Sequence, residues 1–170
     1  MTPINTKAVT NRRSVHFGTL DDLLGDLDEV TKADAAGRVR PLGNWSPGQN
    51  LQHLAKFLAC SLDGFGGDPP LGLKLFGRVL RLVMGKKIFA KPVPPGLKLP
   101  SGVPFLPADE VSVADGAADL RREIERVQSG AAFIPASPFF GKLSREQWIK
   151  LHLRHAELHM SFVGIDNAPA

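Results

Sequence analysis

Cysteine is almost absent from the sequence, and this excludes a protein that is stabilised by internal disulfides. Cys60 is the single cysteine among 170 residues, so no disulfide can form within the chain. The low cysteine content fits a reducing compartment, and we expect a cytoplasmic protein. Arg12 and Arg13 resemble a twin-arginine export signal, but Asp21 and Asp22 follow before any apolar core of the required length.

A long uncharged hydrophobic run is also lacking. The most apolar stretch, residues 71–85, is interrupted by Lys74, Arg78 and Arg81, so it cannot span a bilayer. The net charge of +4 is only mildly basic and does not by itself indicate binding to nucleic acid. The basic segment 71–91 suits a membrane-surface or nucleic-acid contact, but we favour a helix with a solvated basic face. We therefore expect neither a membrane nor a nucleic acid as a partner.

Strand-like alternation and internal repeats are absent as well. The chain is long enough for one domain, in which about 70% of the unfolded chain's surface becomes buried. A hydrophobic content of 43% and a charged content of 22% are typical of a globular protein. We predict an N-terminal arm at residues 1–18, a helical domain at 19–164 and a C-terminal tail at 165–170.

The sequence does contain clear helix-start signals followed by apolar residues at helical spacing. In WSPGQNLQHL, Ser46 and Gln49 form a capping box around Pro47, and they predict a helix that Gly64 ends. A second capping box in SREQW begins at Ser144 and predicts a long helix through LHLRHAELHM.

Two further helices and one long connection complete the predicted fold. Thr19 precedes a predicted helix over 20–36, and Ser112 precedes another. An apolar and basic segment at 71–87 is followed by six prolines between residues 92 and 107, which enforce an extended connection. We predict an all-α fold, namely an up-and-down four-helix bundle with a long proline-rich crossover.

Three of the five histidines lie on one face of the last predicted helix. A helix turns about 100° per residue, so His152, His155 and His159 fall within roughly a 60° arc. His155 and His159 have the i, i+4 spacing with which a helix gives two nitrogen ligands to one metal ion. His53 lies in the apolar stripe of the other capped helix, and antiparallel bundle helices bring such core-facing side chains together.

These residues alone support two interpretations. In the first, His53, His155 and His159 bind a metal ion and leave at least one coordination position open, as catalytic sites do. In the second, they are hydrogen-bonded core residues without a metal. A carboxylate-bridged two-metal bundle is disfavoured because the chain has no Glu-x-x-His pair.

Two motifs resemble those of a known superfamily. WSPGQNLQHLAKF resembles the second helix of DinB/YfiT-like metalloenzymes, where a Trp-Ser start leads to a metal-binding histidine. HAELH resembles their His-x-x-x-His motif on the last long helix. SPFFGKLSREQW is similar to a branch that is known only as a domain of unknown function. The resemblance covers about residues 13–163, and its motifs occur in the right order.

The resemblance implies a DinB/YfiT-like four-helix bundle that binds a divalent metal ion through His53, His155 and His159. Zinc or nickel is the expected metal, and three imidazoles also suit iron and copper. Characterised relatives include transferases and isomerases that use low-molecular-weight thiols, and some have hydrolase-like activity. Relatives often carry histidine and glutamine where this chain has Leu158 and Phe162, so some polar groups around the metal are missing here.

Two functions are compatible with these features. The first is a metal-dependent enzyme, a thiol-dependent transferase or a hydrolase-like protein, that acts on a small molecule. The second is a non-catalytic helical bundle that binds a ligand or partner and has a structural or vestigial metal site. Leu158 and Phe162 favour the second, because they make the surroundings of the site more apolar. A homodimer would cover leftover apolar helix surface in either case.

Further side chains are expected around the site, although the sequence assigns no catalytic residue. His152 lies one turn before His155 and either supports the ligands or lines the cavity. Phe139 and Phe140 belong to a loop that we predict as a wall or lid beside the metal. Trp45 is predicted as a core anchor next to the same pocket.

Overall fold

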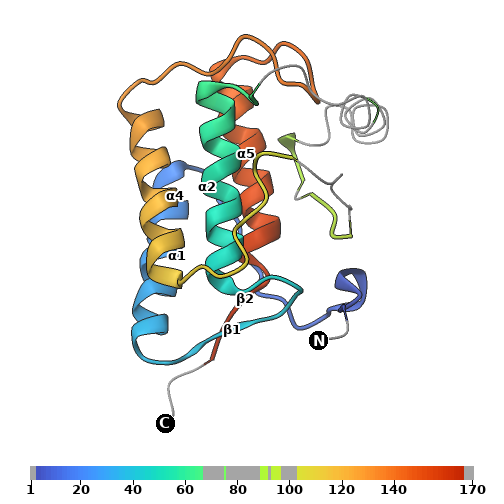
Figure 1. Ribbon diagram of the computed structural model, residues 1–170, viewed down its shortest axis with the longest axis vertical. Helices are drawn as coiled ribbons and strands as arrows, with labels where there is room; N and C mark the ends of the chain where they lie inside the picture. Colours follow the sequence, from blue (N-terminus) through green and yellow to red (C-terminus); the bar gives the residue numbers. More distant parts are fainter. Residues whose placement is uncertain (1–2, 67–74, 76–88, 92, 97–102, 167–170) are drawn as a thin grey trace.

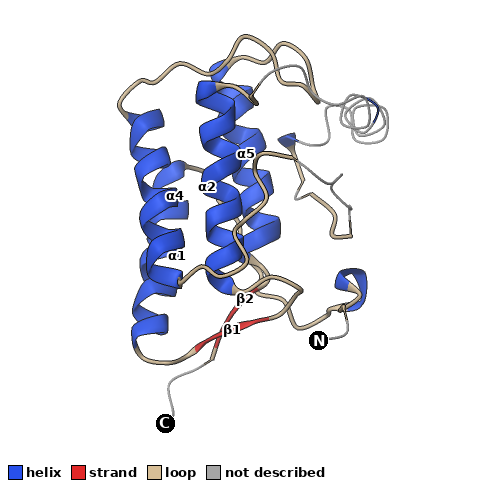
Figure 2. Ribbon diagram, in the orientation of Figure 1, coloured by secondary structure: helices blue, strands red, loops and turns tan. Residues whose placement is uncertain are grey.

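Four helices lie side by side along the long axis of the molecule (Figure 1). The computed structural model describes residues 3–66, 75, 89–91, 93–96 and 103–166. Its helices are α1 Leu20–Ala35, α2 Pro47–Asp63, α4 Val113–Gln128 and α5 Arg145–Met160, together with a short 3₁₀ helix, η1, at Thr6–Ala8. The prediction of a mainly helical domain with four principal helices is confirmed for the described residues (Figure 2).

Side chains at the helix starts pair with backbone N–H groups that lack a partner within the helix. At α2, the Gln49 N–H donates to Ser46 Oγ at 3.1 Å, and the Ser46 N–H donates to Gln49 Oε1 at 2.9 Å. Ser144 and Gln147 make the same reciprocal pair at α5, and so do Thr19 and Asp22 at α1. These predicted starts are confirmed, and they fix the positions at which the histidine-bearing helices begin.

The apolar stripes of the four helices form one hydrophobic core. The side chains in it that are 0 to 2% exposed include Leu27, Leu51, Leu120, Ile124 and Met160, so every helix contributes at least one. Burying a side chain of this size stabilises the fold by about 1.5–3 kcal/mol. This core holds α2 and α5 next to each other over the length that carries the histidines.

Two glycines allow α2 and α4 to approach closely. A Cβ built on Gly116 of α4 would lie 2.6 Å from the Gly48 carbonyl oxygen and 3.0 Å from Leu51 Cβ. A Cβ built on Gly48 would lie 2.2 Å from the Val111 carbonyl oxygen. Because the obstructing atoms are mostly backbone, no side-chain rotation relieves these clashes. The α2–α4 contact therefore requires glycine at both positions.

A two-stranded antiparallel sheet crosses one end of the bundle, so the all-α prediction is wrong in this detail. β1 Val39–Pro41 pairs with β2 Val163–Ile165, with Arg40 opposite Gly164. Each strand has three residues, which is too short for a period-two pattern to be visible in the sequence. α5 ends at Met160, and Phe162 already belongs to the turn that leads into β2.

The last part of the proline-rich crossover runs along α2 (Figure 1). Gln49 Nε2 donates to the Ala108 carbonyl oxygen at 2.9 Å, and the Ala108 N–H donates to Gln52 Oε1 at 2.9 Å. Lys56 Nζ donates to the Leu106 carbonyl oxygen at 2.9 Å. These bonds hold the backbone near Phe105 against the helix that carries His53.

Most of the predicted helical segment at 71–87, and with it most of the basic segment 71–91, lies outside the described residues. Within the part that the structure describes, no helix is long and apolar enough to cross a membrane.

The N-terminal residues pack against the bundle before α1 begins. The Arg13 guanidinium donates to both carboxylate oxygens of Asp26, at 2.7 and 2.9 Å. The Phe17 side chain is 3% exposed, and its N–H donates to Glu157 Oε1 at 2.9 Å. At the other end of the arm, the Ile4 N–H donates to Asn44 Oδ1 at 2.6 Å, and Asn44 Nδ2 donates to the Ile4 carbonyl oxygen at 2.9 Å.

Two glycine-to-alanine substitutions test the helix packing. Gly116→Ala should lower the free energy of unfolding by about 1–3 kcal/mol, because the new methyl group meets α2 backbone. Gly25→Ala is the matched control in α1, where no atom of the described residues outside the neighbouring helix backbone lies within 4 Å of the new methyl group. It should raise stability by about 0.5–1 kcal/mol through helix propensity. Chemical denaturation measures both values, and equal effects of the two substitutions would contradict the close α2–α4 contact.

Candidate metal centre

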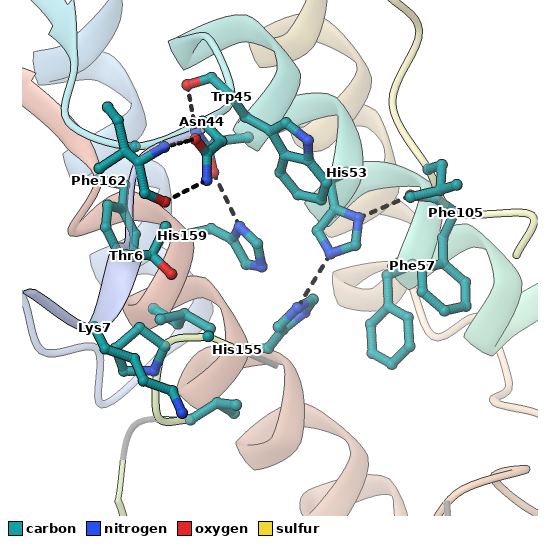
Figure 3. A pocket seen from close by; sticks show the side chains of 18 of the residues that line it. Thr6, Lys7, Asn44, Trp45, His53, Phe57, Phe105, His155, His159 and Phe162 are labelled. Atoms are coloured by element: carbon teal, nitrogen blue, oxygen red, sulfur yellow. Dashed lines mark hydrogen bonds between the residues drawn. The ribbon is translucent and has the colours of Figure 1, made fainter. Parts of the chain in front are cut away.

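The structure brings together three of the histidines that the sequence singles out. His53 on α2 faces His155 and His159 on α5 (Figure 3). Ring centroids lie 5.1 Å apart for His53 and His155, 4.5 Å for His53 and His159, and 4.6 Å for His155 and His159. The His53 ring is 1% exposed and the other two are half-buried. The capping boxes of the two helices set this register.

Hydrogen bonds at the outer ring nitrogens determine which nitrogen carries the proton. His53 Nδ1 lies 2.8 Å from the Phe105 carbonyl oxygen, and His159 Nδ1 lies 3.0 Å from Asn50 Oδ1. Both partners are acceptors, so each Nδ1 carries the hydrogen and each Nε2 keeps a lone pair. The Asn50 amide is itself oriented, because its Nδ2 donates to the Ser46 carbonyl oxygen at 3.0 Å.

The inner nitrogens converge at a spacing that fits a metal ion. His53 Nε2 lies 3.3 Å from His155 Nε2, and the candidate ligand atoms of all three rings lie within 4.8 Å of one another. Nitrogens bound tetrahedrally to zinc at about 2.0–2.1 Å would be roughly 3.4 Å apart. His155 Nδ1 is buried and finds no hydrogen-bond partner in the described part of the chain. The donor set is therefore suitable for a divalent metal ion.

Burial keeps these rings neutral. Desolvation lowers the pKa of His53 to about 4, although the hydrogen bond to the Phe105 carbonyl opposes this shift. Desolvation, and then the neighbouring rings, lower the pKa values of His155 and His159 well below the usual value. Imidazole binds a metal ion only in its neutral form, so the cluster is in its metal-binding protonation state at neutral pH.

A cavity of about 950 Å³ lies beside the histidines. Trp45, Phe139 and Phe140, which the sequence predicts near the site, all line it. The Trp45 ring stacks on His159 with a centroid distance of 5.5 Å and an interplanar angle of 17°. Leu158 and Phe162 line it too, so two further apolar side chains face the site.

His152 does not line this cavity. Its ring is 6% exposed and lies among Phe57, Phe133 and Trp148, with centroid distances of 5.2, 6.0 and 5.9 Å. Its Nε2 finds no hydrogen-bond partner among the described residues. Burial lowers the pKa of this ring to about 3. His152 therefore packs as a neutral core residue one turn from His155.

Sequence reasoning missed two groups that orient the ligands. Asn50 lies three residues before His53, on the same side of α2, and a polar residue inside an apolar stripe is the signal that could have found it. The Phe105 carbonyl has no such signal, because every residue carries one and only the path of the crossover brings this one to His53.

A buried ion pair behind the centre was also missed. Arg154 pairs with Glu157 at 2.8 Å, and the Glu157 side chain is 1% exposed. His16 Nδ1 lies 2.9 Å from Glu157 Oε1, the same oxygen that accepts the Phe17 N–H. Arg154 also donates to the Phe17 carbonyl oxygen. These contacts attach the N-terminal arm to the outer side of the histidine-bearing helix.

Comparison with known families identifies a match over nearly the whole chain. A family described as "Protein of unknown function (DUF1569)" matches residues 9–165, which include all three histidines of the cluster. The chain belongs to this family. No curated protein and no solved structure is significantly similar to it. The family assignment thus agrees with the unknown-function branch that the sequence motifs suggest, and it assigns no activity.

The buried His152 predicts a pH dependence of stability. Its pKa is about 3 in the folded protein, against about 6.5 for a histidine in an unfolded chain. Between these values the unfolded chain binds a proton that the folded protein does not, so stability falls as the pH decreases from 6.5 toward 3. In metal-free protein, His152→Leu removes a group that takes up as much as one proton on unfolding. The slope of the free energy of unfolding against pH should therefore decrease by up to about 1.4 kcal/mol per pH unit.

Urea denaturation of both proteins at several pH values, with a chelator present, measures this difference. Slopes that are equal in the wild type and His152→Leu would show that His152 is not held neutral by the fold.

Proposed function

We propose that the protein is a divalent-metal-dependent enzyme whose metal ion is bound by His53, His155 and His159. The observation that carries this proposal is the convergence of three neutral imidazoles at the wall of a large cavity. Three ligands leave a fourth tetrahedral position open, which is characteristic of catalytic rather than structural zinc sites. Zinc and nickel are the first candidates, and iron and copper accept the same ligands.

The composition of the cavity favours one reaction class. A divalent ion in an open site supplies a Lewis acid that lowers the pKa of a thiol or of water. Among the described residues that line the cavity, none is an aspartate or a glutamate, so no carboxylate is placed there as a general acid or base. Proton transfer to a leaving group is more important in hydrolysis than in thiolate attack on an electrophile. We therefore favour a thiol-dependent transferase over a hydrolase.

In such a transfer, the chain positions two small molecules and excludes water from them. The thiol gives its proton to solvent, its sulfur forms a bond to an electrophilic carbon, and the leaving group departs with the bonding electron pair. The apolar walls at Phe57, Phe105 and Phe139 would hold the electrophile. A low-molecular-weight thiol as co-substrate also agrees with the cytoplasmic location that the cysteine content suggests.

Membership of the DinB/YfiT-like superfamily is part of this proposal. One histidine on α2 and two on α5, in a domain with four principal helices, agree with the motif order of that superfamily. The match to a family of unknown function covers the same region.

The alternative is a non-catalytic bundle that binds a ligand or a partner, including a second copy of the chain. Leu158 and Phe162 support it, because they face the cavity where relatives often carry polar side chains. A purified protein that binds metal but shows no turnover in a screen of thiols with electrophilic acceptors would favour this alternative.

Metal analysis tests the ligand assignment. The wild-type protein should bind about one zinc or nickel ion per chain, and alanine at any one of His53, His155 or His159 should greatly weaken this binding. His16→Ala should bind metal like the wild type, because the imidazole is outside the cluster. Elemental analysis after dialysis measures the stoichiometry, and a triple histidine variant that retains one ion per chain would refute the assignment.

Asn50 should act on metal affinity through His159. Asn50→Ala removes the acceptor that holds the His159 ring, so we expect a 10–100-fold loss of affinity, as for other groups that orient a ligand. Asn50→Asp keeps an acceptor oxygen and should restore most of it. Gln52→Ala is the control on the same helix, since Gln52 bonds the crossover and not a histidine. Competition with a chelator measures affinity, and equal values for Asn50→Ala and Gln52→Ala would contradict this role.

A further inference from the structure

The cavity beside the histidines has an unbalanced distribution of charge. Its lining contains the three imidazoles and Lys7, and no aspartate or glutamate among the described residues. The imidazoles are neutral, so a divalent ion bound to them would keep its full charge of about +2 in apolar surroundings. A charge in such surroundings is costly unless a counter-charge lies nearby. The described residues that line the cavity provide none, and an anionic ligand would supply it.

Lys7 is an exposed lysine that lines the same cavity and brings a positive charge to its rim. It belongs to η1 in the N-terminal arm, which Asn44 holds through its two hydrogen bonds with the backbone of Ile4. The Lys7 side chain crosses Gly96, where an added Cβ would lie 2.5 Å from Lys7 Cε. Gly96 has a φ of +87°, so a side chain there would be strained as well as blocked. The arm and Gly96 together provide space for the lysine stem at the cavity wall.

The opposite wall is apolar and aromatic. Figure 3 shows Phe57 and Phe105 on one side of the histidines, with Thr6 and Lys7 on the other. The Phe57 and Phe105 rings pack edge to face at 5.2 Å, and Phe139 lies 6.3 Å from Phe105. A ligand that reaches across the cavity therefore meets Lys7 at one end, the histidines in the middle and aromatic rings at the other end.

We propose that the cavity binds a small amphipathic carboxylate as the substrate of this enzyme. Its carboxylate lies between the three-histidine centre and Lys7, and its apolar body packs on Phe57, Phe105 and Phe139. A monoanion fits better than a phosphate ester, because no arginine is among the described lining residues and arginine forks are preferred partners of phosphate. The contact between the carboxylate and a metal ion rests on the proposed function. The contacts with Lys7 and with the aromatic wall do not require the metal.

Calorimetric titration with three probes of equal chain length tests the proposal. Octanoate carries the proposed charge, octanamide is its neutral analogue and octylamine its cationic analogue. Zinc-loaded wild-type protein should bind octanoate about tenfold or more tightly than octanamide. Octylamine should bind more weakly than both. Equal affinities for octanoate and octanamide would overturn the proposal and leave the metal centre intact.

Variants of Lys7 measure how much its charge contributes to octanoate binding, apart from the contribution of the metal ion. Lys7→Met should weaken octanoate binding about three- to tenfold without changing octanamide binding, and Lys7→Arg should restore it. Lys32→Met also removes one positive charge, but from α1 and away from the cavity. It should change neither octanoate binding nor octanamide binding. If Lys7→Met and Lys32→Met behave alike, Lys7 is not the anion partner.

Chelated protein distinguishes this proposal from the proposed function. Metal-free wild type should bind octanoate more weakly than the zinc form, yet still prefer it to octylamine through Lys7. A protein that never binds zinc but shows this Lys7-dependent preference would support the ligand class and refute the metal centre. A metal-free protein that binds octylamine as well as octanoate would overturn the role of Lys7.

Discussion

Packing three neutral imidazoles side by side at a cavity wall is the constraint on which the rest of this structure depends. Protonation of any ring would put a charge into a region that has no carboxylate in its described lining, so all three must stay neutral. Neutrality alone does not decide which nitrogen carries each proton. The Phe105 carbonyl and the Asn50 amide decide this for His53 and His159. The crossover and the start of α2 are thereby tied to the histidines of α5.

The parts of the fold that the sequence could predict are those that local spacing determines. A capping box needs only two residues three positions apart, so Ser46 and Ser144 locate the starts of α2 and α5 without any tertiary information. Once the starts are known, helical geometry assigns His53, His155 and His159 to inward faces. The cluster follows because two amphipathic helices in one bundle must turn these faces to the same core.

The parts that could not be predicted depend on contacts between distant segments. β1 and β2 are paired only because the ends of α1 and α5 bring Val39 opposite Ile165, and three residues leave no alternation to detect. The approach of Lys7 to the cavity depends on the path of the N-terminal arm, which a pair of hydrogen bonds to Asn44 fixes. Neither feature has a periodic signal, since the strands pair backbone to backbone and Asn44 bonds the backbone of Ile4, which every residue type would offer.

The apolar residues around the centre affect how strongly charges in the cavity interact. Leu158 and Phe162, taken alone, favour a site with few polar groups for catalysis. In a low-dielectric cavity, however, the remaining charges interact more strongly, because less water screens them. Leu158 and Phe162 supply no polar group that could transfer a proton, so they reduce acid–base chemistry at the site. Because their side chains are apolar, they also strengthen the interaction between a bound anion and any cation in the cavity, and they thereby increase discrimination by charge.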